Sequence, residues 1–208
     1  MGFDREAGSR LGRWFAVFVI LFPVVSGCAS IFGWDIHAPG ILSEGFSEQV
    51  ELARERVALY ISPETFLFQS KDRGGVTADP QAYHVGESFV PMLIEGFQSA
   101  FSEFIFLEEE PTRDILIRYG IPYVAVVRIK EFKNKVGWRG QAVQLMTEAV
   151  VFNSEFEEVK RFESRGTSDA ERVFAKKGGP QVNLNAALEN NIVSTVQYLQ
   201  DFLNQDQK

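Results

Sequence analysis

The chain has 208 residues and carries 21 basic against 28 acidic side chains, which gives a net charge of -7. This acidic balance argues against a nucleic-acid partner, because binding to phosphate groups relies on clustered lysine and arginine. The length suits a targeting segment followed by one domain of ordinary size. A single cysteine excludes a disulfide within the chain, so the stability of the domain has to come from apolar packing.

The first 27 residues have the three zones of an export signal. Arg5, Arg10 and Arg13 give a basic start, and an uninterrupted apolar stretch follows from Trp14 to Val25. This stretch of about 12 residues is shorter than the roughly 20 residues that a membrane-spanning helix needs. The sequence therefore predicts a cleaved signal peptide at residues 1–27 and not a permanent transmembrane anchor.

Small residues precede the cysteine at the end of this signal. Val25-Ser26-Gly27-Cys28 resembles the lipobox of bacterial lipoproteins, in which the cysteine sulfur is acylated and the chain is cleaved ahead of it. The resemblance implies that cleavage falls between Gly27 and Cys28, and that acylated Cys28 binds the mature chain to a membrane. The alternative is an ordinary signal cut near Gly27 that leaves a free cysteine. Lipidation is favoured because this is the chain's one cysteine.

The residues after Cys28 bear on which membrane carries the protein. In lipoproteins of this type an Asp after the cysteine signals retention in the inner membrane, and here Ala29 and Ser30 follow. The resemblance therefore implies an outer-membrane anchor with the domain facing the periplasm. A bacterium with a single membrane would instead carry the protein on its outer surface. Signal cleavage leaves 18 basic and 26 acidic side chains, so the lipid and not charge has to anchor the chain.

Residues 28–47 mix glycine, proline and isolated aromatic residues without a regular period, and we expect a tether there. The periplasmic domain is then expected over residues 48–208. Its first strand is predicted at Val57 to Ile61, a β-branched and aromatic run that ends before Ser62 and Pro63.

The long connection over residues 63–86 has little regular pattern. Two pieces of it, Thr65 to Gln69 and Ala82 to Val85, are interpreted as extended segments that can pair with each other. Connections of this length are often where a protein makes functional contacts. We therefore expect a partner or ligand surface on aromatic side chains in this connection and just after it: Phe66, Phe68, Tyr83 and Phe89.

From Ser88 onward a helix is predicted, because apolar residues recur at every fourth position: Phe89, Leu93, Phe97 and Phe101. Pro91 is compatible with this helix if it lies in the first turn. Phe104 to Leu107 is a continuous apolar run and predicts the second strand. The segment from Thr112 to Tyr119 is ambiguous, but Gly120 after it is typical of a helix stop.

The rest of the chain predicts three further strands, at residues 123–129, 141–152 and 159–166, the last polar enough for a sheet edge. A closing helix is predicted by apolar residues at helical spacing: Leu184, Leu188, Ile192, Val196, Leu199 and Leu203. We therefore expect a single α+β domain with a mostly antiparallel sheet and about two or three helices packed on one face.

The usual parts of a catalytic site are largely missing from the sequence. His37 and His84 are the two histidines, and no motif has the spacing of a catalytic zinc site. The Gly-x-Ser-x-Gly elbow and the phosphate-binding loop are absent as well. The acidic run Glu108 to Glu110 is interpreted as a solvated face. We therefore expect no enzyme, no metal and no cofactor, with His37 in the tether and His84 as a structural residue.

The order of elements on a lipobox-bearing chain resembles small periplasmic lipoproteins that support envelope machines, over roughly residues 55–204. Examples are the accessory lipoprotein of the lipopolysaccharide translocon and the auxiliary lipoproteins of lipid-transporting ABC systems. This likeness of topology implies a non-catalytic accessory or scaffold protein that contacts another envelope protein, and it transfers no residue roles.

The alternative is a module that binds a lipid, glycan or peptidoglycan fragment between the helix from Ser88 and the sheet. The 19 phenylalanines bear on this choice. A closed phenylalanine core favours the scaffold, whereas an open apolar cleft favours the binding module.

Overall fold

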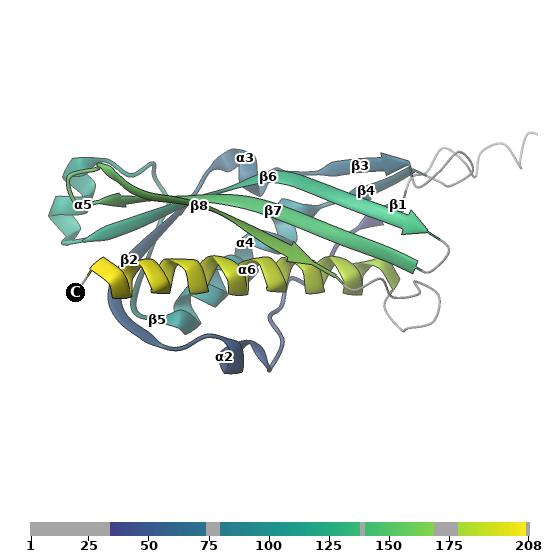
Figure 1. The fold of residues 1–208 in the computed structure, drawn as a ribbon. Coiled ribbons are helices and arrows are strands. Elements are labelled where there is room, and N and C mark those ends of the chain that lie inside the picture. The colour runs from purple at the N-terminus through teal and green to yellow at the C-terminus, as the bar shows by residue number, and fades with distance from the viewer. Residues whose placement is uncertain (1–33, 74–79, 138–139, 169–178, 207–208) are drawn as a thin grey trace, which may run out of the picture.

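The computed structural model describes residues 34–73, 80–137, 140–168 and 179–206, which form an α+β domain as predicted (Figure 1). A three-stranded sheet has the order β1 (Trp34–Ile36), β4 (Pro80–Tyr83), β3 (Ser70–Arg73). A five-stranded sheet has the order β5 (Phe101–Leu107), β2 (Ala53–Ile61), β6 (Tyr123–Gly137), β7 (Gly140–Asn153), β8 (Glu158–Thr167). The helices are α2 (Phe46–Gln49), α3 (Pro63–Phe66), α4 (Val85–Ala100), α5 (Arg113–Tyr119) and α6 (Gly179–Asp206).

The five-stranded sheet is antiparallel in one half and parallel in the other. Strands β6, β7 and β8 follow one another as antiparallel neighbours, as the sequence predicts, and β8 lies at an edge. Strand β2 instead pairs in parallel with both β5 and β6. The reason is connectivity: the chain crosses over through α4 before β5 and through α5 before β6, and such crossovers return a strand in the same direction.

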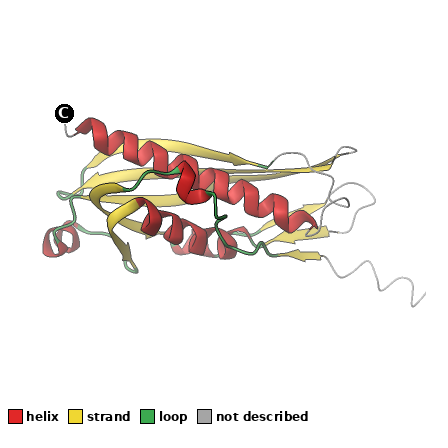
Figure 2. Cartoon of the chain, turned by 90° about the horizontal axis from the view of Figure 1, so that it is seen from below, coloured by secondary structure: helices red, strands yellow, loops and turns green. Residues whose placement is uncertain are grey.

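Helices α4 and α6 lie over one face of this sheet (Figure 2). The apolar side chains at helical spacing are buried in the core between them and the sheet. Phe89, Leu93 and Phe97 of α4 are fully buried, and so are the six predicted core positions of α6. Helix α4 begins at Val85 and not at Ser88, because the fully buried Val85 extends its apolar face by a turn. Pro91 consequently lies inside the helix and not in its first turn.

The connection before α4 contains paired strands, but their bounds differ from the prediction. Strand β3 pairs antiparallel with β4, and Ser70 lies opposite Tyr83. The prediction of an extended segment from Thr65 to Gln69 is wrong, because its first two residues belong to helix α3. Pro63 at the first helical position explains this helix, since proline has the required φ angle and lacks the N–H that would be unpaired there.

The described part of the predicted tether, residues 34–47, packs onto the domain. Strand β1 pairs in parallel with β4, and the side chains of Ile36 and Phe46 are buried in the main core. The backbone N–H of Ser43 donates to Glu189 of α6 at 3.1 Å, and that of Ala38 donates to Ser88 at 3.2 Å. The domain therefore starts earlier than residue 48.

The predicted signal peptide of residues 1–27, with Gly27, and the predicted acylation site Cys28 lie outside the described residues. Among the described helices, none combines the length and the apolar character that a membrane crossing requires.

Helix α6 lies so close to β8 that the two backbones touch at Gly166. A Cβ atom added to Gly166 would lie 2.0 Å from the carbonyl oxygen of Ala187 and 2.4 Å from the backbone nitrogen of Asn191. The buried Asn191 side chain also bonds the sheet, accepting from Thr147 Oγ1 and donating to the carbonyl oxygen of Ser164, both at 3.0 Å. Only glycine fits at position 166 without displacing the helix.

We expect Gly166→Ala to lower the free energy of unfolding by about 1–3 kcal/mol, because the added methyl group has to push α6 away from the sheet. Urea unfolding followed by circular dichroism measures this loss. Gly45→Ala is the control, since the nearest atom to an added Cβ there is 3.8 Å away. Equal stability of the two variants would show that the contact at Gly166 is not a constraint.

Candidate functional site

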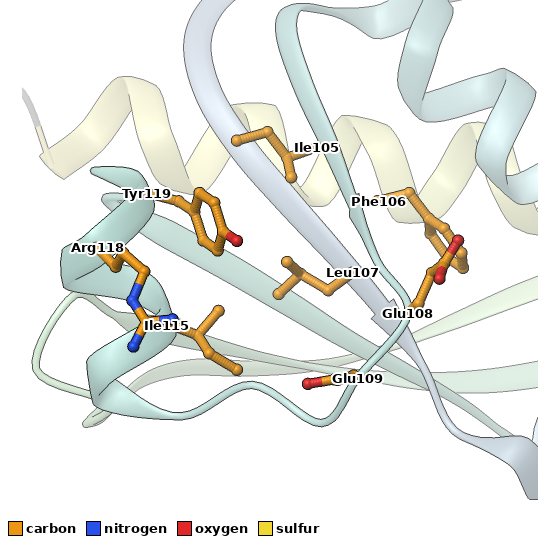
Figure 3. Close-up of a pocket in the computed structure, with 8 residues that line it drawn as sticks. All are labelled: Ile105, Phe106, Leu107, Glu108, Glu109, Ile115, Arg118 and Tyr119. Atoms are coloured by element: carbon orange, nitrogen blue, oxygen red, sulfur yellow. The ribbon is translucent and has the colours of Figure 1, made fainter.

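A pocket of about 350 Å³ opens beside the end of β5. It lies between that strand, the turn that follows it and helix α5 (Figure 3). Its lining residues are Ile105, Phe106, Leu107, Glu108, Glu109, Ile115, Arg118 and Tyr119. Volumes of this order suit a small ligand or one or two side chains of a partner.

Helix α5 forms one wall of the pocket, and its ends are defined by local sequence. Thr112 caps its start by accepting a hydrogen bond from the backbone N–H of Ile115 at 3.4 Å. Gly120 ends it with a left-handed φ of 58°, and Ile121 N–H then donates to the carbonyl oxygen of Leu116 at 2.8 Å. The predicted helix stop at Gly120 is therefore confirmed.

A small second core holds α5 on the sheet face opposite α4 and α6. Leu116 is fully buried there against side chains of β2, β5 and β6: Ala58, Leu107 and Val124. Ile115 packs against the same core, and Arg113 at the start of the helix forms an ion pair with Glu155. Ile117 and Tyr119 are more than half exposed.

The pocket combines an apolar interior with a charged rim. The side chains of Ile105, Leu107, Ile115 and Tyr119 point toward a common centre between β5 and α5 (Figure 3). Glu108 and Glu109 are exposed, in agreement with their interpretation as part of a solvated face. Such an arrangement can bind an apolar group flanked by a charged one.

Strand β5 adds a second feature to the pocket, because it is an edge strand. Within the described sheet its neighbour is β2, and its other side has no strand partner. Half-buried Phe104, Ile105 and Phe106 lie along it. Edge strands offer backbone N–H and C=O groups to an added strand. We call this region the edge patch and define it by these residues: Ile105, Phe106, Ile115 and Tyr119.

The four aromatic residues predicted as a partner surface do not form one. Tyr83 and Phe89 are fully buried, so this part of the prediction is wrong: both side chains belong to the main core. The hydroxyl of Tyr83 donates to Gln81 at 2.7 Å and accepts from Gln141 at 2.5 Å. Phe68 is half-buried against the same core, whereas Phe66 on α3 is 42% exposed.

A carboxylate on the face opposite α4 and α6 is enclosed by cations. Glu148 is only 5% exposed and forms ion pairs with Arg128, with Lys130 at 3.3 Å and with Arg161 at 2.9 Å. Burial raises the pKa of Glu148, but hydrogen bonds and charge from Arg128 and Lys130 outweigh it and lower this pKa. A carboxylate with a lowered pKa is a poor proton donor, and three cations are paired with this one, so we interpret the group as an ion cluster.

Glu148→Gln tests this ion cluster through its pH dependence. Because the folded pKa lies below the ordinary 4.5, the charge stabilises the fold fully above that value, and the contribution disappears as the pH falls through the lowered pKa. We expect the free energy of unfolding of the variant to be about 1–2 kcal/mol lower at pH 7. The loss is modest because two of the cationic partners are half exposed, so solvent screens their ion pairs.

Urea unfolding at a series of pH values measures the difference in the free energy of unfolding between this variant and the original chain. This difference should shrink as the pH falls below the ordinary pKa of a glutamate. Glu95→Gln is the control, because Glu95 is an exposed glutamate on α4, away from the ion cluster. A loss that stays constant with pH would contradict the role given to the charge.

Among the described residues, one group could hold a metal ion: His37, His84 and Glu87. The sequence did not predict it, because His37 is 47 positions from His84 and lies in the segment interpreted as a tether. The group is located where β1 meets the start of α4, away from α5 (Figure 1).

No protein-family model and no curated protein matches the sequence. Several solved structures have a partly similar fold at low identity. The hypothetical protein CT253 from Chlamydia trachomatis is 9% identical, with a TM-score of 0.47 over 73% of this chain and 98% of that one. The PelC dodecamer from Paraburkholderia phytofirmans is 13% identical, with a TM-score of 0.40 over 71% and 88%.

A lipoprotein from Neisseria meningitidis, GNA1162, is 8% identical, with a TM-score of 0.36 over 72% of this chain and 96% of that one. Likeness at this level transfers neither a function nor a residue role to this chain.

Proposed function

We propose that the chain is a membrane-anchored bacterial lipoprotein, held in the outer membrane and facing the periplasm, that serves as a non-catalytic accessory or scaffold component of a cell-envelope assembly. The lipobox-like Val25 to Cys28 supports the anchor, and Ala29 and Ser30 after it support the outer membrane. The observation that carries the scaffold role is the edge patch, where an apolar pocket adjoins a strand edge that has no partner strand among the described residues.

The packing of α4 favours a scaffold over a lipid or glycan carrier. The alternative, a binding module, would hold its ligand between α4 and the sheet, but side chains of the protein itself fill this space. Phe89, Leu93 and Phe97 are fully buried there in one continuous cluster with side chains of the sheet and of α6. Such close packing leaves the phenylalanines as core.

The edge patch suits an extended segment of a partner protein. A strand added beside β5 would pair with its free backbone groups, and one apolar side chain would enter the pocket between Leu107 and Ile115. Basic residues next to it would face Glu108 and Glu109 on the β5 side of the rim, away from Arg118 on α5 (Figure 3). We therefore propose a partner segment that combines an apolar residue with lysine or arginine.

Photo-crosslinking in the native host tests where the partner binds. A photoreactive amino acid at Tyr119 should crosslink one protein after irradiation of cells, and the same amino acid at Tyr198 should not. The two positions are matched because both are helical tyrosines, 56% and 50% exposed, of which only Tyr119 lines the pocket. Mass spectrometry of purified adducts identifies the partner.

A second pair of variants shows whether the adduct depends on the apolar surface. Ile115→Asp should remove the adduct, whereas Ile117→Asp should keep it, since Ile115 lines the pocket and Ile117, on the other side of the same helix, does not. Circular dichroism checks that both variants fold. Equal crosslinking at both tyrosines would contradict the site. A lipid or glycan adduct in place of a protein would favour the binding module.

Anchoring is tested separately through Cys28. We expect Cys28→Ala to abolish acylation and to move the protein from the outer-membrane fraction to the soluble fraction or to an uncleaved precursor. Fractionation and mass spectrometry of the mature N-terminus measure both effects. Ser30→Ala is the control, because it leaves the cysteine and the residues before it unchanged. Unchanged fractionation of the cysteine variant would overturn the proposed anchor.

A further inference from the structure

Strand pairing brings the two histidines of the chain side by side. In the parallel register of β1 and β4, Trp34 lies opposite Gln81 and Ile36 opposite Tyr83. The next position pairs His37 with His84, and the backbone N–H of His84 donates to the carbonyl oxygen of Ile36 at 3.1 Å. Their rings stack with centroids 4.1 Å apart.

Glu87 completes a group of three ligand atoms. It lies one helical turn after His84 at the start of α4, so its carboxylate points to the same side. Its Oε2 is 3.1 Å from Nδ1 of His37 and 3.6 Å from Nδ1 of His84. Tetrahedral zinc with bonds of about 2.0–2.1 Å places neighbouring donor atoms about 3.3 Å apart, which is close to both distances.

His84 is also oriented as a metal ligand would be. Its Nε2 lies 3.3 Å from Oδ1 of Asp35, and the tautomer that donates to this carboxylate leaves a lone pair on Nδ1. A carboxylate that accepts the second ring N–H is the usual partner of a zinc-binding histidine. The side-chain Nε2 of Gln69 lies 3.1 Å from the same Nδ1, so this amide has to move aside when an ion binds there.

We propose that His37, His84 and Glu87 bind a divalent transition-metal ion of the zinc type, with Asp35 orienting His84. The imidazoles have to turn out of their stack, because two rings that bind one ion aim both nitrogen atoms at it. His37 is the side chain that turns, since it is 49% exposed whereas His84 is 19% exposed. The positive dipole at the N-terminus of α4 disfavours a cation, but the negative charges of Asp35 and Glu87 outweigh it.

Binding at this site would fix the N-terminal segment to the domain. His37 comes from the segment after β1, and the other two ligands come from the start of α4. A metal that joins positions 47 apart closes a long loop, and such closures stabilise a fold most. The ion therefore has a structural role in this proposal. The metal site does not depend on the proposed scaffold function.

Zinc titration by calorimetry tests the site. The full chain with Cys28→Ser is purified in detergent without a polyhistidine tag and treated with a chelator. We expect saturable binding of one zinc ion per chain, weakened more than tenfold by His84→Ala or Glu87→Gln. Asp35→Asn should weaken it about 10–100-fold through the orientation of His84. Glu95→Gln, an exposed glutamate on the same helix, should leave it unchanged.

Nuclear magnetic resonance gives an independent readout, because the chain has only two histidines and so only two sets of imidazole signals. Zinc should shift both sets and raise the Tm of the protein. Unchanged imidazole signals at saturating zinc would overturn the proposal, and so would binding that survives in the His37→Ala/His84→Ala variant. The conservative Glu87→Gln and Asp35→Asn variants keep the test valid if that double variant unfolds.

Discussion

The close approach of α6 to the sheet is the constraint on which the rest of the structure depends. At Gly166 the helix backbone rests directly on β8, and Asn191 bonds the sheet where the two are closest. This position fixes the opposite side of the helix as well. There a polar row holds the N-terminal segment: Asn185 bonds Gly40 and Ile41, Glu189 bonds Ser43, Gln197 bonds Gln49, and Gln200 bonds Glu51.

One helix therefore serves two surfaces with two different kinds of interaction. Its row of leucines covers the sheet face through apolar contacts. The stabilisation from such contacts depends on the buried area and not on direction, so it tolerates small shifts of the helix. Its amide side chains bond backbone groups of the N-terminal segment, which lacks a regular partner strand beyond β1. Because these donors and acceptors have fixed geometry, they specify one path for residues 40–51 over the helix.

Elements with a strong period could be predicted from the sequence, since one apolar face is enough to define them. Leu184 to Leu203 of α6 and Val143 to Val151 of β7 are buried as their spacing predicts. The path of residues 34–47 could not be predicted, because its partners lie about 145 positions away on α6. The edge patch was hidden for a related reason: Phe104 to Leu107 has the composition of a buried strand, and only the sheet order leaves it at an edge.

The firmly packed N-terminal segment sets how the domain can stand on a membrane. With acylation at Cys28, as proposed, only five residues lie between the lipid-bearing cysteine and Trp34, the first residue of β1, which makes six Cα–Cα steps. Covalent geometry limits that span to about 20 Å. Helix α6 alone is about 40 Å long, so the domain is longer than the segment that links it to the lipid. The end with β1 would then face the bilayer, and the edge patch at the opposite end would project away from it, toward the interior of the envelope (Figure 1).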